Sequence, residues 1–389
     1  MNSTILLLAT VAFVVVAVMT VTGPLLPLVA HEFTRTVGQA GIIVTAFAVP
    51  YGAFQIVFGP LGDRYGKLRV IALALGVACV FVIGSGLVRS LEGLALMRFC
   101  SGLAMAATIP LAMAWIADEV PAAARQPVMG RYVNGLVMGQ IAGGLLGGFA
   151  AEYFDWRQVF FVLGVACALV AAALWTRAER GPPRSDVAWR WREVLVIYVA
   201  LFRERRARAI IIVGTLEGML IFGVLAYFGA YLRHAFGLDY ARIGLVLCAY
   251  GFGGMIYAAA VRRLMRLLGE RRMVAWGATL LALCYGALVA APAWWLCVPA
   301  LLGAGFGFYL FHNTMQVQAT ELSQSARGTA VALWVFMLFL GQGVGVFLFG
   351  RLIDAVGYGP AFSAAGVAIA LLGLWFSRRM VTHAAPHGG

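Results

Sequence analysis

Charged residues are scarce in this chain, and their scarcity excludes a soluble globular protein. Only 12% of the 389 residues are Asp, Glu, Lys or Arg, whereas 62% are hydrophobic, and the mean hydropathy is +0.91. One soluble core cannot bury that much apolar surface. Apolar runs of roughly 18 residues or more, long enough to cross a bilayer, are centred near residues 18, 48, 79, 106, 138, 166, 220, 250, 282, 308, 339 and 370. The sequence therefore predicts an all-α membrane protein with twelve transmembrane helices.

The chain also lacks the short motifs of catalysis and nucleotide binding. No HExxH, GxSxG or pair of aspartates occurs within an apolar run, so we expect no membrane-embedded enzyme. No GxxxxGK(S/T) loop occurs either, so the energy source is expected to be an ion gradient or the gradient of a transported solute. A sensor or scaffold would need a soluble signalling domain, and twelve helices leave no room for one.

Cysteines are few and widely spaced. All six lie in predicted helices and none forms a CxxC pair; they are Cys79, Cys100, Cys167, Cys248, Cys284 and Cys297. This spacing is typical of reduced structural thiols, and we expect neither a metal site nor a cofactor.

The net charge of +13 follows from membrane topology and does not indicate nucleic-acid binding. With a cytoplasmic N-terminus, most of the 29 basic residues fall on the cytoplasmic side, and those outside are Arg35, Arg89, Arg157, Arg233, Arg242 and Arg351. Positive charge is enriched in cytoplasmic loops, so both termini are expected in the cytoplasm. The first apolar run, residues 5–30, is too long for a secretory signal, and no positive charge precedes it. Because Arg greatly outnumbers Lys, as in GC-rich bacterial genomes, we expect a multi-pass protein of a bacterial inner membrane.

The two halves of the chain resemble each other. A shift of 202 or 203 residues superposes matching positions, among them Gly66 on Gly269, Asp118 on Glu321, Gly139 on Gly341 and Glu152 on Asp354. Similar offsets at separate places indicate a duplicated six-helix unit. We expect an N-terminal bundle at 1–176, a linker at 177–208 and a C-terminal bundle at 209–389. Two such bundles can rock about a shared central cavity, which is alternating access.

The linker is the longest polar segment of the chain. It contains Pro182, Pro183, Trp189 and Trp191 among several arginines. This composition is typical of a short helix on the cytoplasmic membrane surface, with tryptophans at the interface and arginines near anionic lipid. A regulatory docking site is the alternative.

Residues 59–69 contain three glycines, one acid and three bases between two apolar runs, which indicates a tight turn between membrane helices. Their sequence matches the signature Gly-x-Leu-x-Asp-Arg-x-Gly of the major facilitator superfamily at Gly59, Leu61, Asp63, Arg64 and Gly66, and Lys67 stands at a basic position of that signature. The chain resembles this family over essentially its whole length. The resemblance implies two pseudo-symmetric six-helix bundles.

Two further patterns resemble the same family. Arg98 is followed by Gly102 on the fourth run, with Ser101 where the family usually has Gln. The fifth run carries a glycine series similar to the one that marks proton-coupled antiporters, at Gly130, Gly139, Gly143, Gly147 and Gly148. Gly144 stands where that series normally has Pro.

The resemblance also implies a cytoplasmic gate. Its residues would be Gly59, Asp63, Arg64, Gly66, Lys67, Asp118 and Glu119. Asp63 is expected to face the start of the eleventh helix near Gly328, where an anion is stabilised. Lys67 or Arg64 is expected to reach Asp118 or Glu119. A solvated loop that only sets topology is the alternative. In the second half Arg266 occupies the place of Asp63, so we expect the gate charges to be concentrated in the first half.

Two ionisable residues lie inside apolar runs. Glu217 is about eight residues into the run 209–232, roughly 12 Å deep at about 1.5 Å per residue. A charge there is costly, so the carboxyl should face a cavity, bind a proton or substrate cation, or hydrogen-bond between helices. Arg98 lies in the fourth run. It could act on a proton site, bind an anionic substrate, or hold helices together through carbonyl oxygens, unless it snorkels to the surface.

The tenth run contains a polar stretch with His312 at its start, and we include His312 with Glu217 and Arg98 as candidates for proton or substrate coupling. Such a stretch should line the protein interior. A lone histidine is more often a satisfied hydrogen-bonding residue than a metal ligand. The predicted substrate cavity comprises Gln55, Asn134, Gln140, Asn313, Gln316, Gln342, Tyr227 and Trp334.

These observations predict a secondary active transporter. We expect a monomer in the lipid bilayer that exports small amphiphilic molecules, drugs or metabolites, in exchange for protons, with no nucleic-acid partner. A uniporter or a proton symporter that imports a sugar, an amino acid or an organic anion is the alternative, with Arg98 as the anion contact.

Overall fold

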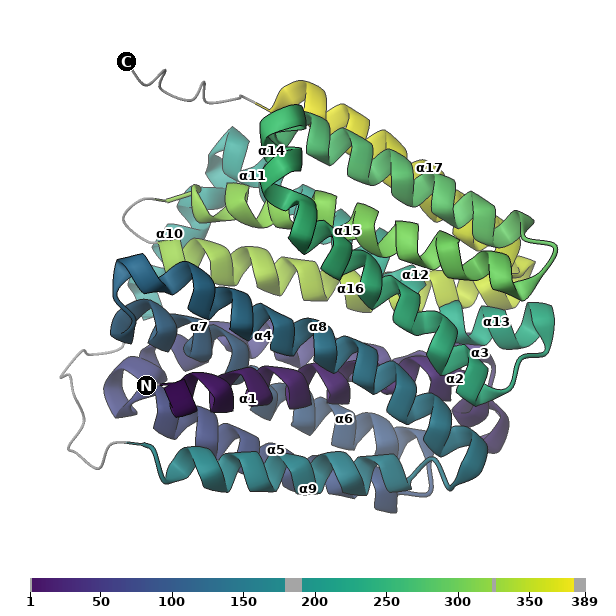
Figure 1. Cartoon of the computed structure of the whole chain (residues 1–389), viewed down its shortest axis with the longest axis horizontal. Helices are drawn as coiled ribbons and strands as arrows, with labels where there is room; N and C mark the ends of the chain where they lie inside the picture. The colour runs from purple at the N-terminus through teal and green to yellow at the C-terminus, as the bar shows by residue number, and fades with distance from the viewer. Residues whose placement is uncertain (1, 179–190, 324–326, 381–389) are drawn as a thin grey trace.

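The computed structural model describes residues 2–178, 191–323 and 327–380, and these are almost entirely helical (Figure 1). Eleven of the described helices are long and apolar enough to cross a membrane. One of them, α14 (Tyr240–Ala290), consists of two helices joined across a kink at Gly269. The predicted all-α fold with twelve membrane helices is thereby confirmed. Pro182, Pro183 and Trp189 of the predicted linker lie outside the described residues.

The first half of the chain supplies six membrane spans. Their helices are α1 (Asn2–Thr20) with α2 (Thr22–Glu32), α3 (Val37–Ala40) with α4 (Ile42–Tyr65), α5 (Lys67–Leu87), α6 (Leu91–Met105) with α7 (Thr108–Glu119), α8 (Ala122–Tyr153) and α9 (Gln158–Trp175). The first, second and fourth spans are thus each divided into two helices. Within this half α1 packs against α8, and α5 packs against α9 and α6.

Helix α10 (Trp191–Arg203) lies in the linker, and the second half then supplies the other six spans. Their helices are α11 (Arg205–Glu217), the π-helix η1 (Gly218–Phe222), α12 (Gly223–Leu225), α13 (Phe228–Phe236), α14, the 3-10 helix η2 (Trp294–Leu296), α15 (Cys297–Thr320), α16 (Arg327–Val356) and α17 (Tyr358–Arg379). The seventh span therefore runs from α11 to α13 through a π-helical turn. In this half α14 packs against α15 and α17, and α11 against α16.

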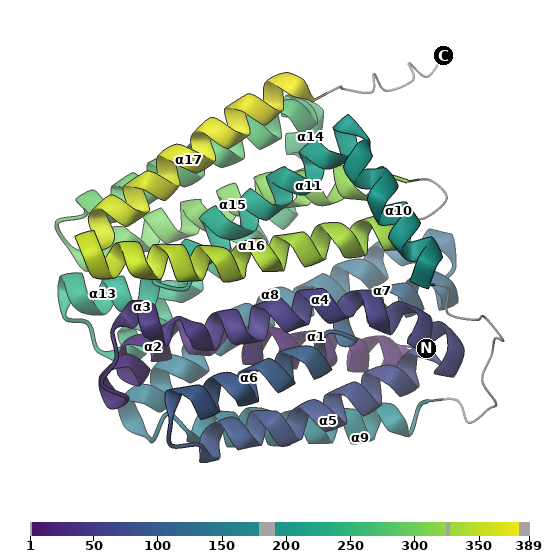
Figure 2. The ribbon, with the colours of Figure 1, turned by 180° about the vertical axis from the view of Figure 1, so that it is seen from behind.

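The two halves lie side by side with their helices roughly aligned (Figures 1 and 2). The most extensive contacts between them are those of α8 with α14 and of α4 with α16, and α3 with α16 and α2 with α13 add contacts at one end. The start of α1 and the end of α17 lie at the same end of the molecule (Figure 1), which we call the termini end. The opposite end, where α3 begins and α13 ends, we call the far end.

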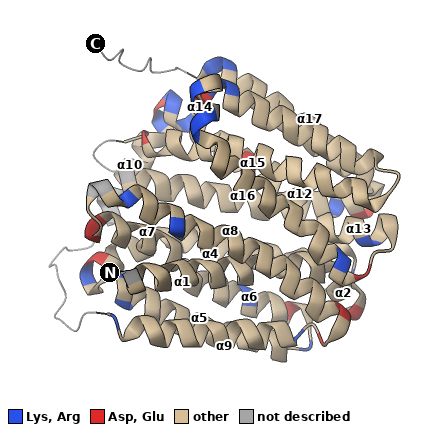
Figure 3. Ribbon diagram, viewed as in Figure 1, with Lys and Arg blue, Asp and Glu red and all other residues tan. Residues whose placement is uncertain are grey.

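Charge is distributed unequally between these two ends (Figure 3). Basic residues gather at the termini end, around the bend in α14 and the starts of α5 and α11, while several acidic residues lie at the far end. The long apolar middle of the bundle separates them. The distribution agrees with the sequence, in which most basic residues fall in the loops on one side of the membrane.

Glycines allow helices to approach closely within each half. Added Cβ atoms on α8 at Gly139 and Gly143 would collide with the backbone of α1 at Phe13 and Ala17. The same holds in the second half, where a Cβ at Gly341 on α16 would collide with the backbone of α11. Gly139 and Gly143 on α8 therefore allow the close contact between the first and fifth spans, and small residues are typical of such contacts in membranes.

Helix α10 crosses the termini end and contacts α11 and α16 (Figure 2). Leu201 is buried, and Ile197 and Tyr198 pack beside it. Val196 and Val199 on the remaining surface are 67% and 50% exposed. The predicted short helix of the linker is therefore present, with one apolar face against the second half and another uncovered.

Candidate functional site

Glu217 and His312 contact each other inside the second half. Glu217 is the last residue of α11 and is completely buried, while His312 lies on α15. The Nδ1 atom of His312 is 2.7 Å from Oε1 of Glu217, and the His312 side chain keeps 16% exposure. A buried carboxyl is tolerated when it is paired or protonated. The structure thus brings together two of the three residues predicted for proton or substrate coupling.

The position of Glu217 follows from a break in the seventh span. The π-helix η1 begins directly after Glu217, at Gly218. An added Cβ at Gly218 would collide with the carbonyl oxygen of Leu338 on α16, so only glycine permits this close approach. Short π-helical segments inside α-helices occur frequently at functional sites. The turn places the glutamate side chain between α11 and α15.

Aromatic rings surround the Glu217–His312 pair. The ring of Phe308 stacks on His312 with centroids 4.9 Å apart, the Trp334 ring lies 5.5 Å away, and the Phe222 ring meets His312 edge-on at 6.3 Å. These rings come from α15, α16 and η1. These apolar rings cover part of the pair, and a less polar surrounding strengthens the electrostatic interaction between the two groups.

Several buried polar atoms in this part of the fold have no hydrogen-bond partner among the described residues. They are Glu217 Oε2, Tyr250 Oη, Tyr285 Oη, Trp334 Nε1 and Gln342 Oε1. Buried polar groups are normally paired, and an unpaired one costs about 1–3 kcal/mol. Unpaired atoms of this kind are typical of sites that bind a proton, water or a polar ligand group. Tyr250 was not among the predicted site residues.

Arg98, the third candidate, is 1% exposed and lies in the first half. Its Nη1 atom donates to the carbonyl oxygen of Val18 at 2.8 Å, and its Nε atom donates to that of Ile43 at 3.4 Å. The guanidinium also lies over the Phe47 ring, 4.3 Å from the centroid. Of the roles considered for this residue, the geometry corresponds to one that holds α1, α4 and α6 together.

The predicted cavity residues are spread over the molecule. Gln55, Gln342 and Trp334 are buried, whereas Asn134 is exposed. Gln140 lies between the halves and accepts a hydrogen bond from Tyr309 at 3.4 Å.

The remaining predicted cavity residues lie on α15 or near the far end. Asn313 and Gln316 on α15 are half-buried. Tyr227 lies apart from the Glu217 group, because it is fully buried and its hydroxyl donates to Val346 at 2.6 Å, close to Gly41 and Gly350. Its phenol therefore supports the far end and does not border the Glu217–His312 pair.

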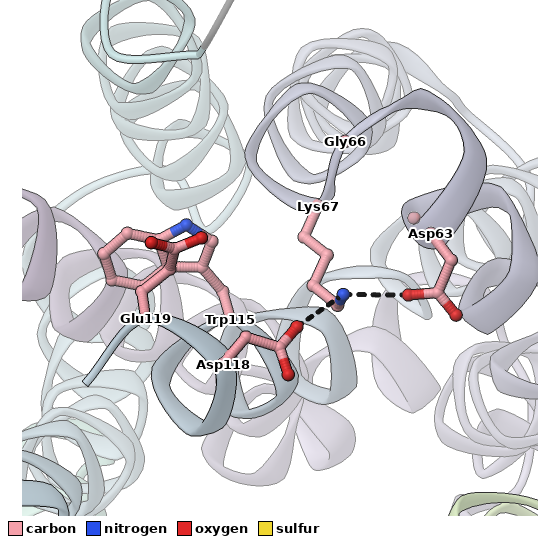
Figure 4. A pocket seen from close by; sticks show the side chains of 7 residues that line it. Asp63, Gly66, Lys67, Trp115, Asp118 and Glu119 are labelled. Carbon is pink, nitrogen blue, oxygen red and sulfur yellow. Dashed lines mark ion pairs between the residues drawn. The ribbon is translucent and has the colours of Figure 1, made fainter. Parts of the chain in front are cut away.

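The predicted gate residues form a compact ion-pair group in the first half (Figure 4). Lys67 Nζ lies 2.8 Å from Asp63 Oδ1 and 2.7 Å from Asp118 Oδ2. Trp115 and Glu119 line the same small pocket. The predicted contact of Lys67 with Asp118 is present, while Arg64 instead lies over the Tyr65 ring.

The gate loop depends on one glycine in an unusual conformation. Gly66 has φ of 91°, which side chains rarely adopt, and it separates α4 from α5 immediately before Lys67. Asp63 contacts Lys67 of its own half, whereas the expected position of Asp63 was the start of the eleventh helix near Gly328.

The second half contains a polar network at the corresponding place, although its loop signature is degraded. Arg206 on α11 donates to Gln318 at 3.1 Å and to Glu321 at 3.2 Å, and Gln318 donates to Glu270 at 2.6 Å. Arg266 instead bonds to a carbonyl of its own helix. The expectation of gate charges concentrated in the first half is therefore incomplete. Arg206 from the seventh span takes the place of Lys67, because Glu270 stands at the repeat position of Lys67. Loop alignment alone gave no signal for Arg206.

Known proteins resemble this chain in sequence and in fold. The family described as Major Facilitator Superfamily matches residues 8–330 and 230–388. An uncharacterized MFS-type transporter of Bacillus subtilis (strain 168), YceJ, is 26% identical over 332 residues, covering 85% of this chain and 84% of its own. The inner membrane transport protein YnfM of Escherichia coli (strain K12) is 24% identical and covers 90% of this chain and 84% of its own.

A solved structure has a similar fold. It is a bacterial homologue of the human lysosomal transporter Spinster, in an inward-facing and unoccupied conformation. It aligns with a TM-score of 0.74 at 19% identity and covers 97% of this chain and 95% of its own. This likeness concerns the fold alone.

Proposed function

Because the chain belongs to the major facilitator superfamily of transporters, we propose that it exports small amphiphilic molecules in exchange for protons. The contact between Glu217 and His312 carries this proposal. A completely buried carboxyl with one partnered and one unpartnered oxygen is suited to bind and release a proton. We propose that the partly exposed imidazole passes this proton between Glu217 and solvent.

Proton binding would change the charge of the pair and thereby its interactions. With a carboxylate and a neutral imidazole the pair is anionic, and one proton makes it neutral overall. An anionic pair in an aromatic surrounding attracts a cationic or polarised ligand group, and a neutral pair releases it. Proton and substrate would then compete for one site, which is the requirement for exchange.

Alternating access supplies the conformational change. The N-terminal bundle at 1–176 and the C-terminal bundle at 209–389 would rock against each other, with the Lys67 ion-pair group and the Arg206 network opening and closing the termini end. The basic residues gathered there (Figure 3) support a cytoplasmic position for this end and for both termini. We propose a bacterial inner membrane as the location and a monomer as the working unit, with a proton gradient in place of any cofactor.

The alternative, an importer that binds an anionic substrate through Arg98, has less support. Two backbone carbonyls and the Phe47 ring already surround the guanidinium. An anion would have to displace these contacts and separate α1 from α6. The geometry therefore favours the Glu217 group over Arg98 as the coupling site.

Transport by inside-out membrane vesicles from an efflux-deficient bacterial host tests the proposal. Ethidium serves as the probe, because it is an amphiphilic cation whose fluorescence reports its accumulation. We expect respiration to drive ethidium into vesicles that contain the wild-type chain and a protonophore to abolish this. Glu217→Gln should lose the proton-driven component.

The matched control is Glu92→Gln, which neutralises an exposed acid at the start of α6, paired there with Arg35. It should behave like the wild type. If Glu217→Gln accumulates ethidium as fast as Glu92→Gln, the coupling role of Glu217 is wrong. Wild-type accumulation that persists with a protonophore would instead contradict proton exchange.

A further inference from the structure

The same short pattern occurs near the far end of α8 and of α16, two of the helices that join the halves. It is a glycine followed four residues later by an acid, Gly148 with Glu152 near the end of α8 and Gly350 with Asp354 near the end of α16. The two copies are separated by 202 residues, the offset of the internal repeat. Both copies lie at the far end.

Each acid accepts a hydrogen bond from the backbone of the opposite half. Glu152 Oε2 accepts from the Tyr240 N–H at 2.8 Å, and Asp354 Oδ1 accepts from the Gly38 N–H at 3.2 Å. Gly38 and Tyr240 are also separated by 202 residues. Asp354 Oδ2 additionally accepts from the Thr36 hydroxyl at 2.6 Å. The two contacts are therefore repeat copies of one interaction, and both cross the boundary between the halves.

The glycine of each pattern makes the contact sterically feasible. A Cβ added at Gly148 would collide with the carbonyl oxygen of Tyr240, and one added at Gly350 would collide with the backbone of Gly38. Each glycine therefore allows one helix to rest on the start of a helix in the other half. The acid one turn further along then reaches the N–H groups of that first turn, where an anion is stabilised.

The acids are not needed to begin the helices that they contact. Thr36 and Gln39 form a complete capping box at the start of α3, and Asp239 caps α14 by accepting from the Arg242 N–H. Each helix start is therefore already capped by residues of its own half. The contacts made by Glu152 and Asp354 stabilise the association of the halves and not the local helix.

We propose that Glu152 and Asp354 are the paired gate residues of the far end, and that both contacts must break for this end to open. The inference rests on the alternating access of the proposed function, but it depends neither on proton coupling nor on the substrate. Both acids are already exposed in the closed arrangement. When the far end opens, the first-turn N–H groups lose their carboxylate partners and become accessible to water. Because one rigid movement separates the halves, loss of either contact weakens the closure at both places.

Hydrogen–deuterium exchange of the full chain in lipid nanodiscs tests this gate. The segments to follow are residues 33–41 and 236–244, which contain the two hydrogen-bond donors from the backbone. Glu152→Ala and Asp354→Ala should each raise exchange in both segments by roughly two- to fivefold, the population shift expected when an exposed anion is lost from a helix N-terminus. For each variant the decisive segment is the one that the substituted acid does not contact, which is 33–41 for Glu152→Ala and 236–244 for Asp354→Ala.

Asp239→Ala is the matched control, since it removes an acid that caps α14 from within the same half. It should raise exchange in 236–244 and leave 33–41 unchanged. Thr36→Val provides a second variant that keeps Asp354 but removes its hydroxyl donor. Because it also removes the local cap of α3, its effect on the gate is measured in 236–244, where exchange should rise. If Glu152→Ala and Asp354→Ala each affect only the segment that they contact, the acids are local caps and the proposed gate is wrong. The exchange measurement needs neither substrate nor proton gradient. It therefore tests the gate even if the chain does not transport ethidium.

Discussion

His312 Nδ1 lies 2.7 Å from Glu217 Oε1, although 95 residues separate them in the chain. The imidazole is partly exposed and the carboxyl is not. A proton that reaches Glu217 along this contact must pass through the imidazole, so His312 is placed to relay protons as well as to orient the carboxyl. These two roles can be separated by substitution.

We predict that His312→Gln keeps the stability of the protein and loses proton-driven transport. A glutamine amide can still donate to Glu217 but cannot take up a proton. We therefore expect the thermal midpoint in detergent to change little and proton-driven ethidium accumulation to fall by about tenfold or more, the order of magnitude of general acid–base assistance.

His312→Phe is the companion variant, since it removes the hydrogen bond as well. It should lower stability by about 1–3 kcal/mol, because it leaves Glu217 Oε1 buried without a partner. Tryptophan fluorescence during thermal unfolding measures this difference. A His312→Gln variant with full proton-driven transport would show that the imidazole is not a relay.

Arg98 gives a second prediction, which follows from its two carbonyl contacts. Lysine has one donor group in place of the guanidinium fork and cannot reach both carbonyls, so Arg98→Lys leaves a buried charge poorly bonded and should destabilise the protein by about 3 kcal/mol. Methionine has similar length and no charge, and Arg98→Met should be the more stable variant.

Ethidium transport by the same two variants separates a structural from a direct role of Arg98. If the residue only joins helices, Arg98→Met should retain transport in proportion to the protein that folds. Complete loss of transport in a well-folded Arg98→Met variant would instead indicate direct participation in coupling.

The sequence predicted the fold because lipid places a simple demand on the chain. Each span must be apolar over about 20 residues, and breaks between spans need glycine or charge. Gly66 and the degraded loop around Gly269 marked two such breaks, and both glycines have positive φ in the structure. Hydropathy could not show that the seventh span contains a π-helical turn, because that turn is set by packing of Gly218 against Leu338.

The candidate site was predictable only as separate residues. Glu217 and His312 each stood out as costly polar groups in apolar runs, but a single residue in a helix does not reveal which neighbouring helix it faces. For Arg98 the sequence left several roles open. Every residue has a backbone carbonyl, so the sequence does not show which carbonyls accept hydrogen bonds from the guanidinium. The offset of 202 residues paired Glu152 with Asp354, yet their partners lie on helices that only the tertiary structure brings near.

The glycines of α8 give a third prediction, with a control from the same helix. A Cβ at Gly139 would collide with the carbonyl oxygen of Phe13, whereas nothing lies within 4 Å of one at Gly130. Gly139→Ala must separate α8 from α1 and should destabilise the protein by about 1–3 kcal/mol. Gly130→Ala should be neutral or slightly stabilising, because alanine favours helix. Equal thermal midpoints for the two variants would contradict the close contact of these helices.

The gate loop gives a fourth prediction, which compares two glycines that differ in backbone conformation but not in steric contact. Neither Gly59 nor Gly66 has a neighbour within 4 Å of an added Cβ, but Gly66 alone of the two has positive φ, at 91°. Gly66→Ala should therefore cost about 1–2 kcal/mol through the backbone alone. Gly59→Ala lies within α4 and should be neutral or stabilising.

The strain at position 66 also has a functional consequence. Relief of the strain would rotate the start of α5 and move Lys67 away from Asp63 and Asp118, since Lys67 is the next residue. We expect Gly66→Ala to slow ethidium transport together with its loss of stability, and Gly59→Ala to leave both unchanged. A Gly66→Ala variant as stable and active as Gly59→Ala would show that the loop relaxes without loss of the ion pairs, and that the left-handed turn is not what positions Lys67.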